Sequence, residues 1–231
     1  MSHTRHVPST MHDQLVDTVA EIKPRLRGWL HAATAPLAFI ALLGMLVVAD
    51  TTRDRLGVAV YMVSALLLFT CSAVYHTGTW SPRHLRLLKR IDHANIFVLI
   101  AGSSTPFALM LLSEQRAAIL LATMWGGAAL GIAFKIFWVD APRWSNAPLY
   151  LLLGWAPVIF AGDFVDAASP TVLFLLTAGG LLYTAGAVVY GTKRPDPSPA
   201  FFGYHEVFHS LTVAAFAAHC LGVGVLLHTQ G

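Results

Sequence analysis

The sequence predicts an all-α integral membrane protein, built as a bundle of seven transmembrane helices. Hydrophobic residues make up 56% of the 231 residues and charged residues only 12%, whereas about a quarter of a soluble domain is charged. The mean hydropathy is +0.63. Apolar stretches of about twenty residues recur along the chain, and each is long enough to cross a hydrocarbon core of about 30 Å as a helix.

The apolar stretches divide the chain into a short tail and one membrane domain. We predict spans at residues 28–48, 57–77, 91–112, 117–138, 147–164, 171–190 and 203–228. Their short connections indicate that residues 28–231 form one compact bundle without a separate soluble domain. Residues 1–27 hold scattered charges and two prolines, and they lack the early apolar core of a signal peptide. We expect them to form a cytoplasmic tail.

The basic residues orient this bundle. Twelve of the fifteen lysines and arginines fall on one side of the predicted membrane: Arg5, Lys23, Arg25, Arg27, Arg83, Arg86, Lys89, Arg90, Lys135, Arg143, Lys193 and Arg194. Because basic loops stay in the cytoplasm, we predict a cytoplasmic N-terminus and an extracytoplasmic C-terminus. The basic residues behind the net charge of +3 are then expected to contact anionic lipid headgroups. We expect membrane lipids as partners and no nucleic acid, and no protein partner is identifiable.

The first two spans contain histidines near their cytoplasmic ends. His31 lies in the first span, where a lone histidine is more often interfacial or hydrogen-bonded than a metal ligand. It remains a candidate for contact with a nearby site. The second span ends with Ser72 and His76, which are four residues apart and therefore share a helix face.

The third span follows a predicted loop at 78–89 and opens with Asp92 and His93. A carboxylate at a helix N-terminus is favoured by capping and by the helix dipole. An ionisable residue facing a bundle interior, however, indicates function. The two side chains project about 100° apart, so they cannot share one centre, and we favour Asp92. Further along, the small residues before Pro106 predict a close approach between helices.

The last four spans differ sharply in polarity. Spans four to six are rich in Gly, Ala and Leu and are expected to be scaffold. The connection 191–202 contains three prolines, so it cannot be helical throughout. It leads into His205 and His209, which share one face of the seventh span. His219 is ten residues further on, about 15 Å deeper and on another face, and is not expected to bind the same metal.

Three helix ends converge at one membrane depth in this topology. The second span finishes inside at His76, the third starts inside at Asp92, and the seventh starts inside at His205 and His209. Three neutral imidazoles that leave a fourth position open are the ligand set of a catalytic zinc. Such a zinc lowers the pKa of its water to about 7. The sequence therefore predicts a Zn²⁺ site at the inner leaflet.

Two further side chains suit hydrolytic chemistry at this site. Asp92 is placed to hold or deprotonate the water, and Ser72 to bond a ligand or orient a substrate carbonyl. The predicted reaction is hydrolysis of an amide or ester whose apolar tail enters from the bilayer. A filled zinc site can also be purely structural, so a non-enzymatic membrane sensor remains the alternative.

These motifs resemble the progestin and adipoQ receptor family, in its bacterial hemolysin III-like branch. The resemblance covers nearly the whole chain and rests on Ser72-x-x-x-His76 and on the segments 90–94 (RIDHA), 102–106 (GSSTP) and 202–209 (FGYHEVFH). It implies that the residues matching His76, His205 and His209 bind zinc. It also implies that Asp92 contacts the zinc-bound water and that Ser72 lies beside the site.

The resemblance also implies a class of activity. The eukaryotic receptors of the family are associated with ceramidase-like activity, and the alkaline ceramidases have a similar pattern of Ser, Asp and three His. The bacterial branch is linked to membrane lipid homeostasis and carries the hemolysin name. We therefore expect a zinc-dependent lipid amide or ester hydrolase in the plasma membrane, with a cytolytic protein as alternative. Without an extended N-terminal domain, protein-hormone reception is not expected to transfer.

The motif around Glu206 has a second interpretation. His205, Glu206 and His209 satisfy H-E-x-x-H, the pattern of zinc proteases that use the glutamate as base. Intramembrane proteases of this type place a third ligand in a later segment with an Asp-Gly dipeptide, which this chain lacks. Glu206 is therefore expected at the helix mouth. Its role, and those of His31 and His93, stay open.

Overall fold

A computed structural model describes residues 26–138 and 143–230. Within this part of the chain the structure is helical, in the order α2 (Trp29–Val48), α3 (Thr52–Thr77), α4 (Pro82–Leu111), α5 (Glu114–Phe137), α6 (Arg143–Trp155), the 3₁₀ helix η1 (Ala156–Phe160), α7 (Ala161–Ala167), α8 (Pro170–Thr192) and α9 (Tyr204–Gln230). Seven stretches are long and apolar enough to cross a membrane. The predicted all-α seven-span bundle is thereby confirmed. Almost all of the predicted tail 1–27 lies outside the described residues, and the cytoplasmic assignment of the N-terminus stays a prediction.

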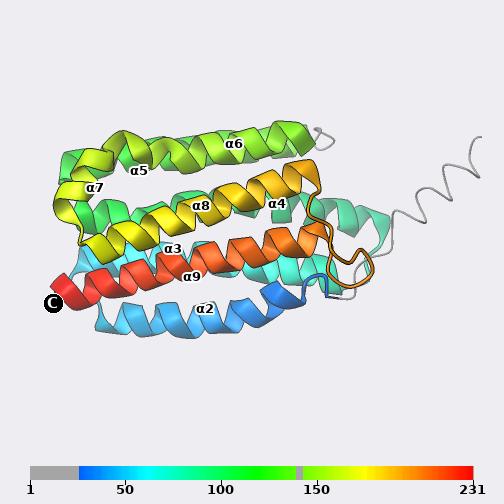
Figure 1. Ribbon diagram of the computed structural model, residues 1–231, viewed down its shortest axis with the longest axis horizontal. Helices are drawn as coiled ribbons and strands as arrows, with labels where there is room; N and C mark the ends of the chain where they lie inside the picture. Colours follow the sequence, from blue (N-terminus) through cyan, green and yellow to red (C-terminus); the bar gives the residue numbers. More distant parts are fainter. Residues whose placement is uncertain (1–25, 139–142, 231) are drawn as a thin grey trace, which may run out of the picture.

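The helices lie side by side with their axes roughly parallel (Figure 1). The most extensive helix pairs are α3 with α4, α8 with α9, α2 with α3, and α4 with α5. Helix α9 therefore packs between α8 and α2. Its N-terminal end lies at the same end of the bundle as the start of α2 and opposite the C-terminus of the chain (Figure 1).

Two helices begin earlier than their apolar stretches. Helix α3 starts at a capping box in which Thr51 and Asp54 satisfy each other's backbone N–H groups. Helix α4 starts after the cap Ser81, with Pro82 in its first turn. The predicted loop at 78–89 is thus wrong, because most of it is helix. Asp92 consequently lies ten residues inside α4 and cannot serve as its cap.

Small residues let α3 and α4 approach closely, as the stretch before Pro106 predicted. A Cβ added to Gly102 would lie 2.1 Å from the Ser64 hydroxyl oxygen, and one added to Gly57 would lie 2.9 Å from Pro106 Cα. Without a hydrophobic force between helices in lipid, such close packing is a main source of association. It holds the helix that carries His76 against the helix that carries Asp92.

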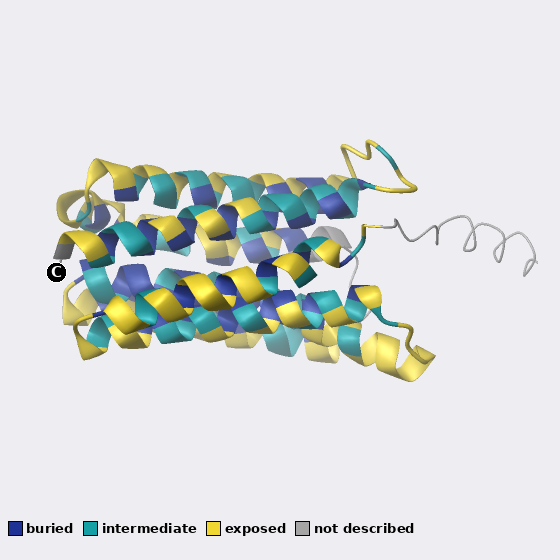
Figure 2. Cartoon of the chain, turned by 90° about the horizontal axis from the view of Figure 1, so that it is seen from below, coloured by how far each residue is buried: buried dark blue, intermediate teal, exposed yellow. Residues whose placement is uncertain are grey.

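The outer surface of the bundle is apolar. Figure 2 shows exposed and buried residues alternating around each helix, and the exposed positions include large side chains such as Leu37, Ile40, Leu130 and Leu152. This surface suits a hydrocarbon solvent. The fifth span, Ala147–Ala167, is not one continuous α-helix. It passes through η1 at Pro157, which has no N–H to continue an α-helical ladder.

Candidate metal centre

Three histidines from two helices converge at one end of the bundle. His76 lies in the last turn of α3, and His205 and His209 lie in the first two turns of α9. One ligand nitrogen from each falls within 4.8 Å of the other two. His76 and His209 are buried and His205 is half-buried. The structure thus brings together the three side chains that the sequence selected.

The geometry of this triad fits a zinc ion. The Nε2 atoms of His76 and His205 are 3.2 Å apart, and two nitrogens bound at 2.0–2.1 Å to one tetrahedral zinc would lie roughly 3.3 Å apart. The His205 and His209 rings have centroids 4.4 Å apart, one helical turn along α9. Three neutral imidazoles are also ligands that zinc prefers. The triad can therefore hold a metal ion, and zinc suits both its donor atoms and its spacing.

Asp92 and Ser72 border the triad from the neighbouring helices. The Asp92 carboxylate is buried, with Oδ2 3.8 Å from Nε2 of His76. Ser72 lies one turn before His76 on α3, next to the Asp92 carboxyl group. Its buried hydroxyl makes no bond with a backbone carbonyl of α3 within the described residues, so its neighbour is the Asp92 carboxyl group. A carboxylate and a hydroxyl group thus lie beside the three histidines.

Glu206 is occupied by other contacts. One carboxylate oxygen accepts a 2.9 Å bond from Nε of Arg27, and the other accepts a 2.8 Å bond from the backbone N–H of Gly203. The side chain is 1% exposed. Both oxygens therefore serve the mouth of α9 and its junction with the segment before α2. This is the helix-mouth position expected from the sequence, and it leaves no free oxygen for a protease-type base.

His31 packs directly on a ligand of the triad. Its ring stacks on His209 with centroids 3.9 Å apart and planes 12° apart, and Phe69 contacts its edge. Neither ring nitrogen has a hydrogen-bond partner among the described residues. Of the two possibilities left open for His31, contact with the site is the one observed, because the ring is buried rather than interfacial.

Gly28 permits this approach of α2. It has φ 86°, a left-handed conformation that favours glycine. A Cβ at this position would lie 2.7 Å from Cβ of His76. The start of α2 can therefore lie against the end of α3 only because this residue has no side chain. Sequence reasoning missed Gly28 and Arg27, although a glycine before an apolar span was a visible signal.

His93 is not one of the three grouped histidines, but it lines the same cavity as His205 and His209. Its Nε2 lies 3.4 Å from the Tyr190 hydroxyl, and its backbone carbonyl accepts a bond from the Tyr150 hydroxyl. These contacts tie α4 to α6 and α8. His219 also lies apart from the triad, where its Nε2 is 3.2 Å from the carbonyl of Leu176 on α8.

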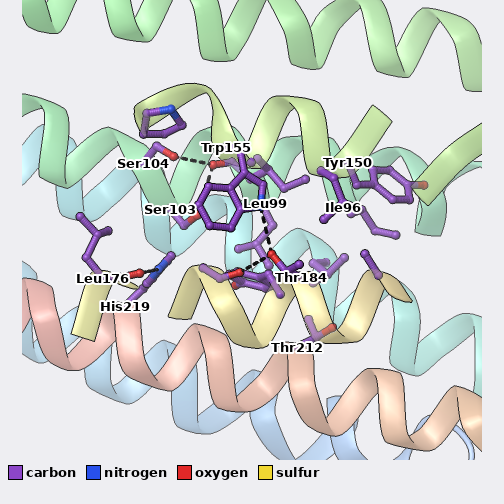
Figure 3. A pocket seen from close by; sticks show the side chains of 18 of the residues that line it. Ile96, Leu99, Ser103, Ser104, Tyr150, Trp155, Leu176, Thr184, Thr212 and His219 are labelled. Atoms are coloured by element: carbon purple, nitrogen blue, oxygen red, sulfur yellow. Dashed lines mark hydrogen bonds between the residues drawn. The ribbon is translucent and has the colours of Figure 1, made fainter. Parts of the chain in front are cut away.

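An apolar cavity of about 290 Å³ opens from this centre into the bundle. Asp92, Ser72, His205 and His209 line one end, and His219 lines the wall further along α9. The remaining walls come mainly from α4, α6, η1 and α8, part of which is shown in Figure 3. Spans five and six were expected only as scaffold. They also shape this cavity.

The matched family model supports the sequence resemblance. The model described as "Haemolysin-III related" matches residues 19–220, which is most of the chain. The chain is 31% identical to a hemolysin-3 homolog of Bacillus subtilis (strain 168) over 191 residues, covering 81% of this chain and 86% of that protein. It is 32% identical to hemolysin-3 of Bacillus cereus over 163 residues, covering 69% and 74%.

A plant protein is also similar. The heptahelical transmembrane protein ADIPOR2 of Oryza sativa subsp. japonica is 29% identical over 185 residues, which cover 73% of this chain and 81% of that protein. The word heptahelical in its name agrees with the seven spans found here. Together with the bacterial relatives, this match supports the progestin and adipoQ receptor family and its hemolysin III-like branch.

Proposed function

The chain belongs to the haemolysin-III related family, and from that premise we propose that it is a zinc-dependent hydrolase of a lipid amide or ester. It is a multi-pass membrane protein, and a plasma-membrane location fits its bacterial relatives. One observation carries the proposal. Two histidines of a triad suited to zinc, His205 and His209, and the adjoining Asp92 carboxylate line one end of an apolar cavity inside the bundle. The polar groups that could carry out hydrolysis therefore lie next to an apolar wall that could bind a lipid chain.

Three histidines would hold the metal. His76, His205 and His209 are the ligands, and the stacked His31 ring restrains His209. Bound zinc would supply a Lewis acid and a water whose pKa is lowered to about 7. By this stacking His31 would limit the orientations that the His209 ring can adopt. The packing of α2 on α9 would therefore contribute to metal binding.

Asp92 would act as the proton carrier. Its Oδ2 atom is close enough to the triad that a water between them can donate a hydrogen bond to it. As general base, Asp92 takes a proton from this attacking water, and as general acid it returns the proton to the departing amine or alcohol. Ser72 Oγ, beside the Asp92 carboxyl group, would donate to the substrate carbonyl oxygen and orient it. The apolar walls bind the acyl chain and exclude bulk water.

The proposal is tested by fatty-acid release from purified protein in lipid nanodiscs. Wild type is compared with Asp92→Asn, using ceramide and ester lipids with and without a zinc chelator. We expect Asp92→Asn to retain zinc and to lose about 100-fold or more of the release rate, the usual contribution of a general acid–base group. The control is Asp166→Asn, at an exposed position in α7.

Two outcomes would overturn the proposal. If zinc-loaded wild type releases no fatty acid above the chelator-treated sample from any amide or ester lipid, the zinc is structural and the sensor interpretation replaces hydrolysis. If Asp92→Asn and Asp166→Asn release fatty acid at the same rate, Asp92 does not carry the proton.

A further inference from the structure

At the distal end of the cavity, two buried polar atoms have no hydrogen-bond partner among residues 26–138 and 143–230. These are Nδ1 of His219, on α9, and the hydroxyl of Tyr183, on α8. Both residues line the cavity, and their ring centroids are 5.6 Å apart. An unmet hydrogen-bonding group inside a membrane protein is costly because no lipid tail can satisfy it. A polar group of a ligand that reached this end of the cavity could satisfy both atoms.

Four hydroxyl side chains elsewhere along the cavity walls are already hydrogen-bonded. Ser103 and Ser104 both donate to the carbonyl of Ile100, and Thr212 donates to the carbonyl of Phe208. These are the bonds by which hydroxyl side chains normally serve their own helix. Thr184 donates to Gly180 and accepts from Trp155, a contact drawn in Figure 3. His219 and Tyr183 differ from them because each keeps one polar atom without a hydrogen bond to a described residue.

The bond to Leu176 fixes the chemistry of the His219 ring. Figure 3 shows this bond, in which Nε2 lies 3.2 Å from the Leu176 carbonyl oxygen. A carbonyl only accepts, so the Nε2 atom of the neutral ring carries the proton and Nδ1 presents a lone pair. Gly179 leaves room for the ring, because any Cβ there would lie 2.2 Å from Cδ2 of His219. The edge of Phe107 packs nearby, with ring centroids 5.7 Å apart.

The two unmet atoms are complementary to one functional group. His219 Nδ1 offers an acceptor and the Tyr183 hydroxyl offers a donor. An alcohol can donate to the first and accept from the second. A ketone or ester carbonyl could only accept and would leave Nδ1 unmet, and a hydrocarbon would leave both unmet.

We propose that the distal end of the cavity is a subsite for a hydroxyl group carried on the far part of a lipid chain. His219 lies ten residues beyond His209 on α9, so the subsite is about 15 Å from the triad along the helix axis. A chain anchored near Asp92 would present its distal half to His219 and Tyr183. The inference rests on the proposed lipid occupant of the cavity, but it does not depend on hydrolysis.

The test compares ricinoleic acid with oleic acid, which differs from it only in lacking a hydroxyl in the distal half of the chain. Binding to the full-length protein in nanodiscs is measured by displacement of radiolabelled oleic acid, with the metal site loaded and after chelation. We expect wild type to bind ricinoleic acid roughly tenfold more tightly, the effect of two neutral hydrogen bonds.

Two variants separate the hydroxyl contact from the shape of the cavity. In Tyr183→Phe, which removes only the phenolic oxygen, the preference should fall at least threefold. In Tyr150→Phe it should persist, because that hydroxyl also lines the cavity but is bonded to the His93 carbonyl.

Each result decides the matter in one direction. Equal affinity of wild type for the two acids overturns the subsite while leaving the proposed hydrolase intact. A preference that survives Tyr183→Phe unchanged also overturns it. If neither acid binds, the cavity does not accept a lipid chain and both proposals fail. If the protein prefers ricinoleic acid in a Tyr183-dependent way but releases no fatty acid, the subsite is supported and the proposed hydrolase activity is contradicted.

Discussion

Helix α9 places histidines in two different environments. At its start, His205 and His209 meet His76 from α3, with Nε2 atoms of His76 and His205 only 3.2 Å apart. Further along, His219 contacts a backbone carbonyl and the edges of two aromatic rings. Both regions border the same cavity. One residue type on one helix is thus arranged as a candidate metal ligand at one end and as a single hydrogen-bonding group at the other.

The difference lies in what the neighbouring helices present. At the start of α9, three imidazoles with lone pairs converge and a carboxylate adjoins them, which is a strong attraction for a cation. Around His219 the neighbours are Gly179, Phe107 and Tyr183, none of which is a common zinc ligand. Spacing along α9 determines which faces the histidines occupy. The partner helices determine what each face can bind.

The largest expected effect separates the two ends by metal content. In His209→Ala, zinc affinity should fall more than 100-fold, because one of three ligands is lost and even supporting contacts are worth about 10- to 100-fold. In His219→Ala, zinc affinity should match wild type. Metal analysis after dialysis against a competing chelator measures both. Equal zinc retention in the two variants would remove the proposed distinction between the two ends of the helix.

A smaller effect is expected at the mouth of α9. Glu206→Ala should lower the free energy of unfolding by about 2–3 kcal/mol, because Gly203 N–H loses its partner and Arg27 loses its anion. The value is below the cost of breaking a fully buried pair, because the Arg27 side chain is 25% exposed and can reach water. Denaturation in detergent measures the change, and zinc should be retained.

Glu114→Ala is the matched control for this effect. Glu114 is also an acid in a first helical turn, at the start of α5, but it is exposed. Its replacement should change the unfolding free energy by less than about 0.5 kcal/mol. A Glu206→Ala variant that is as stable as wild type but catalytically dead would instead favour the H-E-x-x-H interpretation.

The smallest expected change in stability comes from filling the space that Gly179 leaves beside the His219 ring. Gly179→Ala should destabilise the protein by about 1–3 kcal/mol, because the new methyl group collides with the imidazole and forces α8 and α9 apart. At Gly180, the next residue of α8, a Cβ meets no atom within 4 Å. Gly180→Ala should therefore be as stable as wild type or slightly more so. Thermal unfolding of the pair measures this, and similar losses in both would contradict the close packing.

Hydropathy located the spans but placed the start of α4 wrongly. Window averages end where charges begin, and the segment before Ile91 contains five basic or histidine side chains, Arg83, His84, Arg86, Lys89 and Arg90. Charges do not prevent a helix from continuing into the headgroup region. The signal that could have corrected the boundary was Ser81 followed by Pro82, a cap and a favoured first-turn residue.

The candidate ligands were predictable for a different reason. His76, Asp92 and the pair on α9 are ionisable groups near the ends of apolar spans, where few such groups occur. The alternating direction of the spans places them at one end of the bundle. Contacts across unrelated segments were not predictable in this way. The stacking of His31 on His209 and the bond from Arg27 to Glu206 depend on how α2 approaches α9.

By itself, the sequence determined the membrane class, the seven spans and the side chains that share the depth of His76, because hydrophobicity and helical spacing are properties of the chain taken locally. Only the tertiary structure decided that both oxygens of Glu206 accept hydrogen bonds and that spans five and six line a cavity. It also decided that His219 and Tyr183 each keep one polar atom without a hydrogen bond to a described residue. These features depend on helix rotation and close approach. In a bundle whose helices are apolar all round, side-chain packing and hydrogen bonds between neighbours set both.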